Sequence, residues 1–136
     1  MLFRSMDQVI TIASMIEKEV RFAPERTLVS QVIYNRLDIG MQLQIDATVL
    51  YALDKRPDRL LESDRLVESP YNTYFCPALP IGPIASPGID CIRAALYPEE
   101  GRFLYYVLKD PETGEHYFTH DYDDFLRAVS QYITGN

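Results

Sequence analysis

The sequence predicts an α+β domain that is mostly helical and carries one small antiparallel β-hairpin before a C-terminal helix. Apolar residues recur at helical spacing in both halves of the chain, and prolines and glycines separate these stretches. Two short runs rich in aromatic residues flank a turn-forming segment near the C-terminus, which is typical of a hairpin. A length of 136 residues suits one domain, so we treat residues 1–136 as a single unit.

The first helix is predicted to begin at residues 5–8, whose sequence Ser-Met-Asp-Gln fits a capping box. Ile12 and Ile16 belong to its apolar face. We expect the helix to end near Phe22, because Pro24 disfavours helical geometry in the residue before it.

Glu17 and Glu19 flank that apolar face, each about 80° from its centre. A carboxyl group held against apolar surroundings can keep its proton near neutral pH, as a general acid acting on a glycosidic bond must. Helix geometry does not choose between the two residues. The alternative interpretation is that both only solvate the edges of an amphipathic helix.

A second helix is predicted from Pro24 to Gly40, since proline suits a first turn and glycine a C-terminal end. Arg36 projects from its apolar stripe, where an unpaired guanidinium would be costly. We expect it to pair with an anionic or hydrogen-bonding group, unless its long side chain reaches solvent at the helix end. The candidate partners are Glu17, Glu19 and Asp46.

The middle of the chain is predicted to form a wall rather than a linker. Asp46 is expected to cap a short third helix over residues 47–53, and residues 58–69 are expected to form a surface excursion. Residues 70–87 hold five of the nine prolines, interleaved with aromatic and amide side chains that suit a sugar polymer. The alternative is a rigid structural loop that packs its rings on the core.

The last third predicts helix, hairpin and helix. A helix should start at Pro87 and stop before Pro98, and strands should cover residues 103–108 and 116–119 with a turn over 110–114. The final helix should begin near Asp121, since apolar residues recur at helical spacing from Phe125 onward.

Composition and spacing exclude several classes of function. A net charge of -7 argues against a nucleic-acid partner, and no run of residues reaches the length of a membrane span or resembles a secretory signal. Cys76 and Cys91 form no CxxC pair. His116 and His120 stand four apart, but in a stretch that looks extended and lacks the metalloprotease glutamate. We therefore predict no metal site and no cofactor.

Several blocks, in order and over nearly the whole chain, resemble the YceG-like family of endolytic murein transglycosylases. They are residues 13–19 (ASMIEKE), 34–37 (YNRL), 39–41 (IGM), 43–44 (LQ), 46–49 (DATV), 69–74 (SPYNTY), 79–84 (LPIGPI), 87–88 (PG) and 104–107 (LYYV).

This resemblance implies an enzyme that cuts peptidoglycan glycan strands between N-acetylmuramic acid (MurNAc) and N-acetylglucosamine (GlcNAc), leaving a 1,6-anhydro-MurNAc end. It places the catalytic carboxylate at Glu19, and it makes Asp46 or Glu17 the preferred partner of Arg36, since direct contact with Glu19 would oppose an acid role. The matching groove positions, expected to bind substrate, are Asn35, Arg36, Gln44, Asp46, Tyr71, Asn72, Thr73 and Tyr74.

The family also implies surroundings for the enzyme. Its members carry an N-terminal membrane helix and a LysM-like domain before this region, so we expect a catalytic segment acting at the extracytoplasmic face of a bacterial membrane, near cell-wall synthases. Two other functions remain open at this point: a glycan hydrolase, and a non-catalytic peptidoglycan-binding module.

Overall fold

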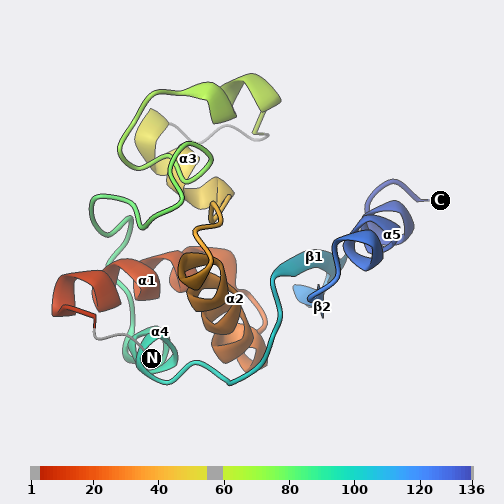
Figure 1. The fold of residues 1–136 in the computed structure, drawn as a ribbon, viewed down its shortest axis with the longest axis horizontal. Helices are drawn as coiled ribbons and strands as arrows, with labels where there is room; N and C mark the ends of the chain where they lie inside the picture. Colours follow the sequence, from red (N-terminus) through yellow and green to blue (C-terminus); the bar gives the residue numbers. More distant parts are fainter. Residues whose placement is uncertain (1–3, 55–59, 136) are drawn as a thin grey trace.

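The computed structural model describes residues 4–54 and 60–135, and within them five α-helices and a two-stranded antiparallel sheet form the predicted α+β fold (Figure 1). The α-helices are α1 (Met6–Glu19), α2 (Arg26–Asp38), α3 (Asp46–Leu53), α4 (Ile89–Leu96) and α5 (Tyr122–Tyr132). The strands are β1 (Tyr105–Asp110) and β2 (Glu115–Thr119), and two 3₁₀ turns are η1 (Ala23–Glu25) and η2 (Glu62–Leu66).

Helix α1 begins with the predicted capping box and ends earlier than expected. The Ser5 hydroxyl accepts the Gln8 backbone N–H at 3.2 Å, and the Gln8 side chain accepts the Ser5 N–H at 3.0 Å. The predicted end near Phe22 is wrong, because Val20 is already extended and caps the helix. Glu19 is therefore the last residue of the helix.

Helices α1, α2 and α4 pack together around the apolar face predicted for α1. Ile12 and Ile16 are fully buried there, together with Val29 of α2 and Ala95 of α4. Figure 1 shows these three helices grouped on one side of the molecule, with α3 and the loop after it beyond them. This packing stabilises the segment from which Glu19 projects.

Helix α3 covers the predicted residues, but its cap differs. Asp46 is its first residue rather than its N-cap, and the N-cap Ile45 offers no side-chain hydrogen bond. The expected capping role of Asp46 is therefore wrong, because its carboxylate is bonded to other side chains. Of the predicted surface excursion over residues 58–69, residues 58 and 59 lie outside the described part of the chain.

The segment after η2, called the wall below, is irregular and is held by buried polar contacts. The Ser14 hydroxyl of α1 accepts the Ile84 N–H at 3.0 Å, and the Thr73 hydroxyl accepts the Ile45 N–H at 2.8 Å. Thr48 of α3 bonds the same Thr73 hydroxyl at 3.0 Å. The wall is thus tied both to α1 and to the start of α3.

The hairpin and α5 follow the prediction, with shifts of two residues or fewer at the ends of each element. Tyr106 pairs with Phe118 across the hairpin, and a bulge lies between Leu108 and Asp110. Asp121 caps α5 through its side chain, and α5 packs on both strands. Figure 1 shows the hairpin and α5 standing to one side of α1, α2 and α4. Side-chain hydrogen bonds, such as that between Tyr106 of β1 and Glu19 of α1, connect the hairpin to the helices.

Candidate active site

The structure separates Glu17 and Glu19, which helix geometry could not. Glu17 is exposed, and its Oε1 accepts the backbone N–H of Gly88 at 2.8 Å, so this carboxylate holds the end of the wall. Glu19 is partly buried, and its Oε1 accepts the Tyr106 hydroxyl at 2.8 Å. Only the second carboxyl group is both shielded from water and held by a donor from another element.

The surroundings of Glu19 favour its protonated form. Burial is the largest cause that raises the pKa of the Glu19 carboxyl group, and the nearby charge of Asp46 raises it further. The hydrogen bond from Tyr106 and the charge of His116 act in the opposite direction and lower it. The net result is a pKa above the usual value of 4.5, which is the condition for a general acid.

Asp46 belongs to a polar cluster beside Glu19. Its Oδ1 accepts a very short hydrogen bond from the Tyr74 hydroxyl, and Arg65 donates to both carboxylate oxygens at 3.3 Å. The Arg65 guanidinium also lies 5.0 Å from the centre of the Tyr74 ring. Burial, followed by the bond to Asp46, raises the pKa of Tyr74 well above its usual range, so this hydroxyl stays a donor. The cluster therefore fixes the orientation of the Tyr74 ring.

Arg36 is buried as predicted, but its expected partners are wrong. It contacts neither Asp46 nor Glu17; its Nε donates to the Leu104 carbonyl at 2.7 Å, and its Nη1 donates to the carbonyls of Gln42 and Leu43 at 3.1 and 2.9 Å. Three main-chain oxygens therefore replace the expected carboxylate. This arrangement ties the chain before β1 to the loop after α2, and the guanidinium lies 5.5 Å from the Tyr105 ring centre.

Other predicted groove residues point inward. Asn35 donates to the carbonyls of Gly101 and Phe103 at 3.0 and 2.9 Å. Asn72 is 2% exposed, donates to two carbonyls and accepts the Tyr74 N–H, and Thr73 is equally buried. The polar groups of these three side chains are bonded within the protein, so their direct contact with a substrate stays a prediction.

Gln44 and Tyr71 are more accessible. Gln44 is exposed and has a left-handed backbone conformation, with φ 53°. Its backbone N–H donates to the Thr73 carbonyl. Tyr71 is half-buried, with its ring 4.8 Å edge-on from Tyr51. These two residues, with Tyr74 and Asp46, are predicted groove positions whose side chains are at least partly exposed.

Sequence reasoning missed Tyr106, Arg65 and the role of His116. His116 had been weighed only as a zinc ligand, yet its Nδ1 lies 2.9 Å from Glu25 Oε1. Strand alternation could have found Tyr106, because it shares one face of the hairpin with Phe118 and His116. Among the described residues no group of three or more His, Cys, Asp and Glu side chains could hold a metal ion.

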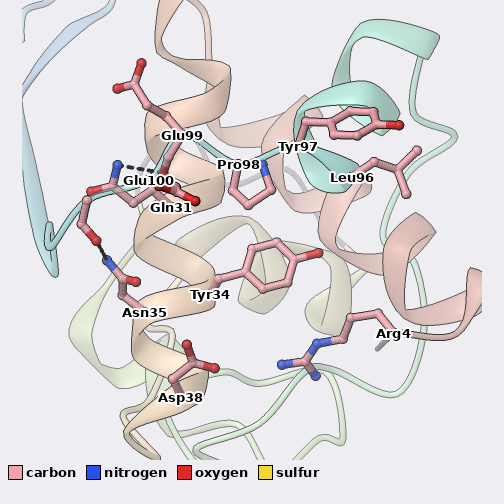
Figure 2. Close-up of a pocket in the computed structure, with 11 residues that line it drawn as sticks. Arg4, Gln31, Tyr34, Asn35, Asp38, Leu96, Tyr97, Pro98, Glu99 and Glu100 are labelled. Atoms are coloured by element: carbon pink, nitrogen blue, oxygen red, sulfur yellow. Dashed lines mark hydrogen bonds between the residues drawn. The ribbon is translucent and has the colours of Figure 1, made fainter. Parts of the chain in front are cut away.

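Two cavities lie away from Glu19. One of about 440 Å³ opens between α2 and the chain after α4, where the Tyr34 ring faces Arg4 (Figure 2). The other, of about 520 Å³, lies between the start of α1 and residues 77–81. Glu19 lines neither cavity.

Comparison with known proteins gives consistent matches. The model of the YceG-like family matches residues 2–131. The chain is 41% identical over 131 residues to the endolytic murein transglycosylase of Bacillus subtilis, and 32% identical over 136 residues to that of Streptococcus pneumoniae. These alignments cover 96% of this chain but 36% and 24% of the two relatives. A crystal structure of a YceG-like protein from Listeria monocytogenes matches with a TM-score of 0.85 and 40% identity, over 90% of this chain and 40% of that one.

Proposed function

Because the chain belongs to the YceG-like family, we propose that it is the catalytic part of an endolytic murein transglycosylase. The observation that carries the proposal is Glu19, a shielded carboxyl group with a raised pKa and a fixed hydrogen bond from Tyr106. The proposed substrate is the glycan strand of peptidoglycan, and the bond cut is the one between MurNAc and GlcNAc.

In the first step Glu19 gives its proton to the glycosidic oxygen as the bond from that oxygen to C1 breaks. The Tyr106 hydroxyl donates to Oε1, so the proton of Glu19 is carried on Oε2. In the second step the Glu19 carboxylate takes the proton of the muramoyl C6 hydroxyl while the C6 oxygen bonds to C1. The product has a 1,6-anhydro-MurNAc end, no water is consumed, and Glu19 is protonated again.

One carboxylate performs both steps, so the arrangement around Glu19 requires no second acid to activate water. Asp46 supports the first step because its negative charge raises the pKa of Glu19. In this proposal Gln44, Tyr71 and Tyr74 face the glycan. Asn35, Arg36, Asn72 and Thr73 hold the backbone that shapes the groove.

The proposed setting is the extracytoplasmic face of a bacterial membrane, in a longer protein with a membrane anchor and with cell-wall synthases as partners. The names of the relatives support action on the cell wall, and the chain spans about a quarter to two-fifths of their lengths. Within residues 4–54 and 60–135, no helix is long and apolar enough to cross a membrane.

Glu19→Gln tests the proposal against Glu17→Gln as its matched control. Glutamine keeps the shape of Glu19 but cannot give and take a proton, so we expect the rate of glycan cleavage to fall by ~10²- to 10⁴-fold. Glu17→Gln should lower the rate far less, since its exposed carboxylate bonds the Gly88 backbone and not Tyr106. An active Glu19→Gln variant beside an inactive Glu17→Gln variant would overturn the assignment.

A further inference from the structure

Glu25 is a buried acid that the proposed reaction does not use. It follows α1 by six residues, ends η1, and is 6% exposed. A buried carboxylate is costly unless hydrogen bonds compensate it, so its partners have to be accounted for.

Both partners of Glu25 come from one residue on the hairpin. Glu25 Oε2 accepts the His116 backbone N–H at 2.8 Å, and Oε1 lies 2.9 Å from His116 Nδ1. Because a carboxylate only accepts, Nδ1 carries the hydrogen in this pair. The His116 side chain is 11% exposed, so the contact is nearly dry. The pair fixes both the strand and the ring orientation of His116 to the turn after α1.

The His116 ring leads directly to Tyr106. The two rings stand edge to face, with centroids 5.2 Å apart and planes at 89°. Phe118 supports Tyr106 from the same face of the hairpin at 5.5 Å. The hydroxyl of Tyr106 then donates to Glu19 at 2.8 Å. A continuous series of contacts therefore runs from Glu25 through His116 and Tyr106 to the Glu19 carboxyl group.

These contacts matter because Glu19 and Tyr106 belong to different parts of the fold. Glu19 belongs to α1, whereas Tyr106 belongs to a hairpin that stands to one side of the helices (Figure 1). Only five residues lie between Glu19 and Glu25, so bonding Glu25 to β2 restrains how far the end of α1 can lie from the hairpin. Arg21 adds a bond to the Pro111 carbonyl at 3.0 Å, but at an exposed site farther along the turn.

We propose that Glu25 and His116 are positioning residues for the active site: they hold the Tyr106 ring so that its hydroxyl meets Glu19 Oε1. Neither residue touches Glu19 or the glycan in this arrangement. Both hold the Tyr106 ring, and the charge of His116 also acts on Glu19 from a distance. This inference rests on the proposed function, because it assigns a role in a reaction that Glu19 performs.

The proposal predicts an effect on the rate rather than on substrate binding. Misplacing a reacting group by about 1 Å can cost on the order of a hundredfold in rate. Glu25→Ala and His116→Asn should therefore lower kcat for anhydro-end formation by roughly ten- to a hundredfold and leave KM for peptidoglycan unchanged. Glu25→Gln keeps an oxygen that can accept one of the two hydrogens, so it should recover part of the lost rate.

A double-mutant cycle distinguishes positioning from simple support of the fold. Tyr106→Phe removes only the hydroxyl, so it abolishes the contact through which the pair is proposed to act. In the Tyr106→Phe background, His116→Asn should cost little further kcat, because the two changes remove the same contact. Tyr117→Phe is the matched control: it removes a 2.7 Å bond to Asp124 on the other face of the hairpin and should leave kcat unchanged.

Three results would overturn the inference. The first is a wild-type kcat in folded Glu25→Ala and His116→Asn. The second is a fully additive loss in the double variant, and the third is an equal loss in the Tyr117→Phe control. If any of these three results occurs while Glu19→Gln is inactive, the positioning role fails and the proposed function stands. If Glu19→Gln cleaves glycan normally, the proposed function itself fails.

Discussion

Replacing Glu19 by glutamine should stabilise the protein at neutral pH, although it removes the proposed acid. Burial holds the pKa of the folded carboxyl group above the value of 4.5 that describes an unhindered glutamate. As the pH rises above 4.5, the unfolded chain releases this proton first, and the folded chain keeps it longer. The free energy of unfolding therefore falls as pH rises through this window, and the loss is complete above the folded pKa.

Glutamine avoids this loss because it never ionises. Its amide oxygen can still accept the Tyr106 hydroxyl, so the contact seen at Oε1 is retained. A difference of one pH unit between folded and unfolded pKa corresponds to about 1.4 kcal/mol, or roughly 5 °C in Tm for a domain of this size. We expect Glu19→Gln to melt above the wild type at pH 7, and the gap in Tm to close as the pH falls to 4.

Thermal melts by circular dichroism from pH 4 to pH 8 measure this gap. Glu68→Gln removes one exposed carboxylate and controls for the general effect of a lost negative charge. A Glu19→Gln variant that melts below the wild type at pH 7, with the gap closing at pH 4, would show that the ionised carboxylate stabilises the fold. That result would refute the argument that Glu19 is held protonated.

Three further changes follow from the contacts at the site. Arg36→Ala leaves three main-chain carbonyls without their donor and should lower the free energy of unfolding by roughly 1–3 kcal/mol for each carbonyl that stays buried and unsatisfied, measured in urea titrations. An unchanged midpoint would mean that solvent replaces the guanidinium. Asn72→Ala leaves two carbonyls and one backbone N–H without their side-chain partner, so it should lower the free energy of unfolding by about 2–3 kcal/mol in the same assay. An unchanged free energy of unfolding would show that water satisfies these groups. The rate of cleavage should decline as pH rises past the raised pKa of Glu19. The Tyr106 hydrogen bond lowers that pKa, so Tyr106→Phe should raise it and move the decline to higher pH. A move of the decline to lower pH would contradict the assignment.

Local patterns in the sequence predicted most of the fold. The capping box at Ser5, the apolar face of α1 and the cap of α5 at Asp121 each depend on residues close together in the chain. The end of α1 was harder, because the sequence allowed the helix to continue to Phe22. The chain instead leaves the helix at Val20, and this places Glu19 in the last turn.

Long-range contacts account for what the sequence could not predict at the site. The choice between Glu17 and Glu19 depends on Tyr106, which lies 87 residues from Glu19. Arg36 was expected to seek a carboxylate, yet main-chain carbonyls satisfy it, and every residue type carries that acceptor. The pair of Glu25 and His116 was invisible for the same reason, since it spans 91 residues.

Product analysis tests the central claim most directly. Glycan strands digested by the wild-type protein should yield fragments with 1,6-anhydro-MurNAc ends in mass spectrometry, each lighter by one water than the hydrolysed form, and Glu19→Gln should yield none. Reducing MurNAc ends would instead indicate a hydrolase. Intact strands with the wild-type protein bound to them would indicate a peptidoglycan-binding module, and either result would contradict the account.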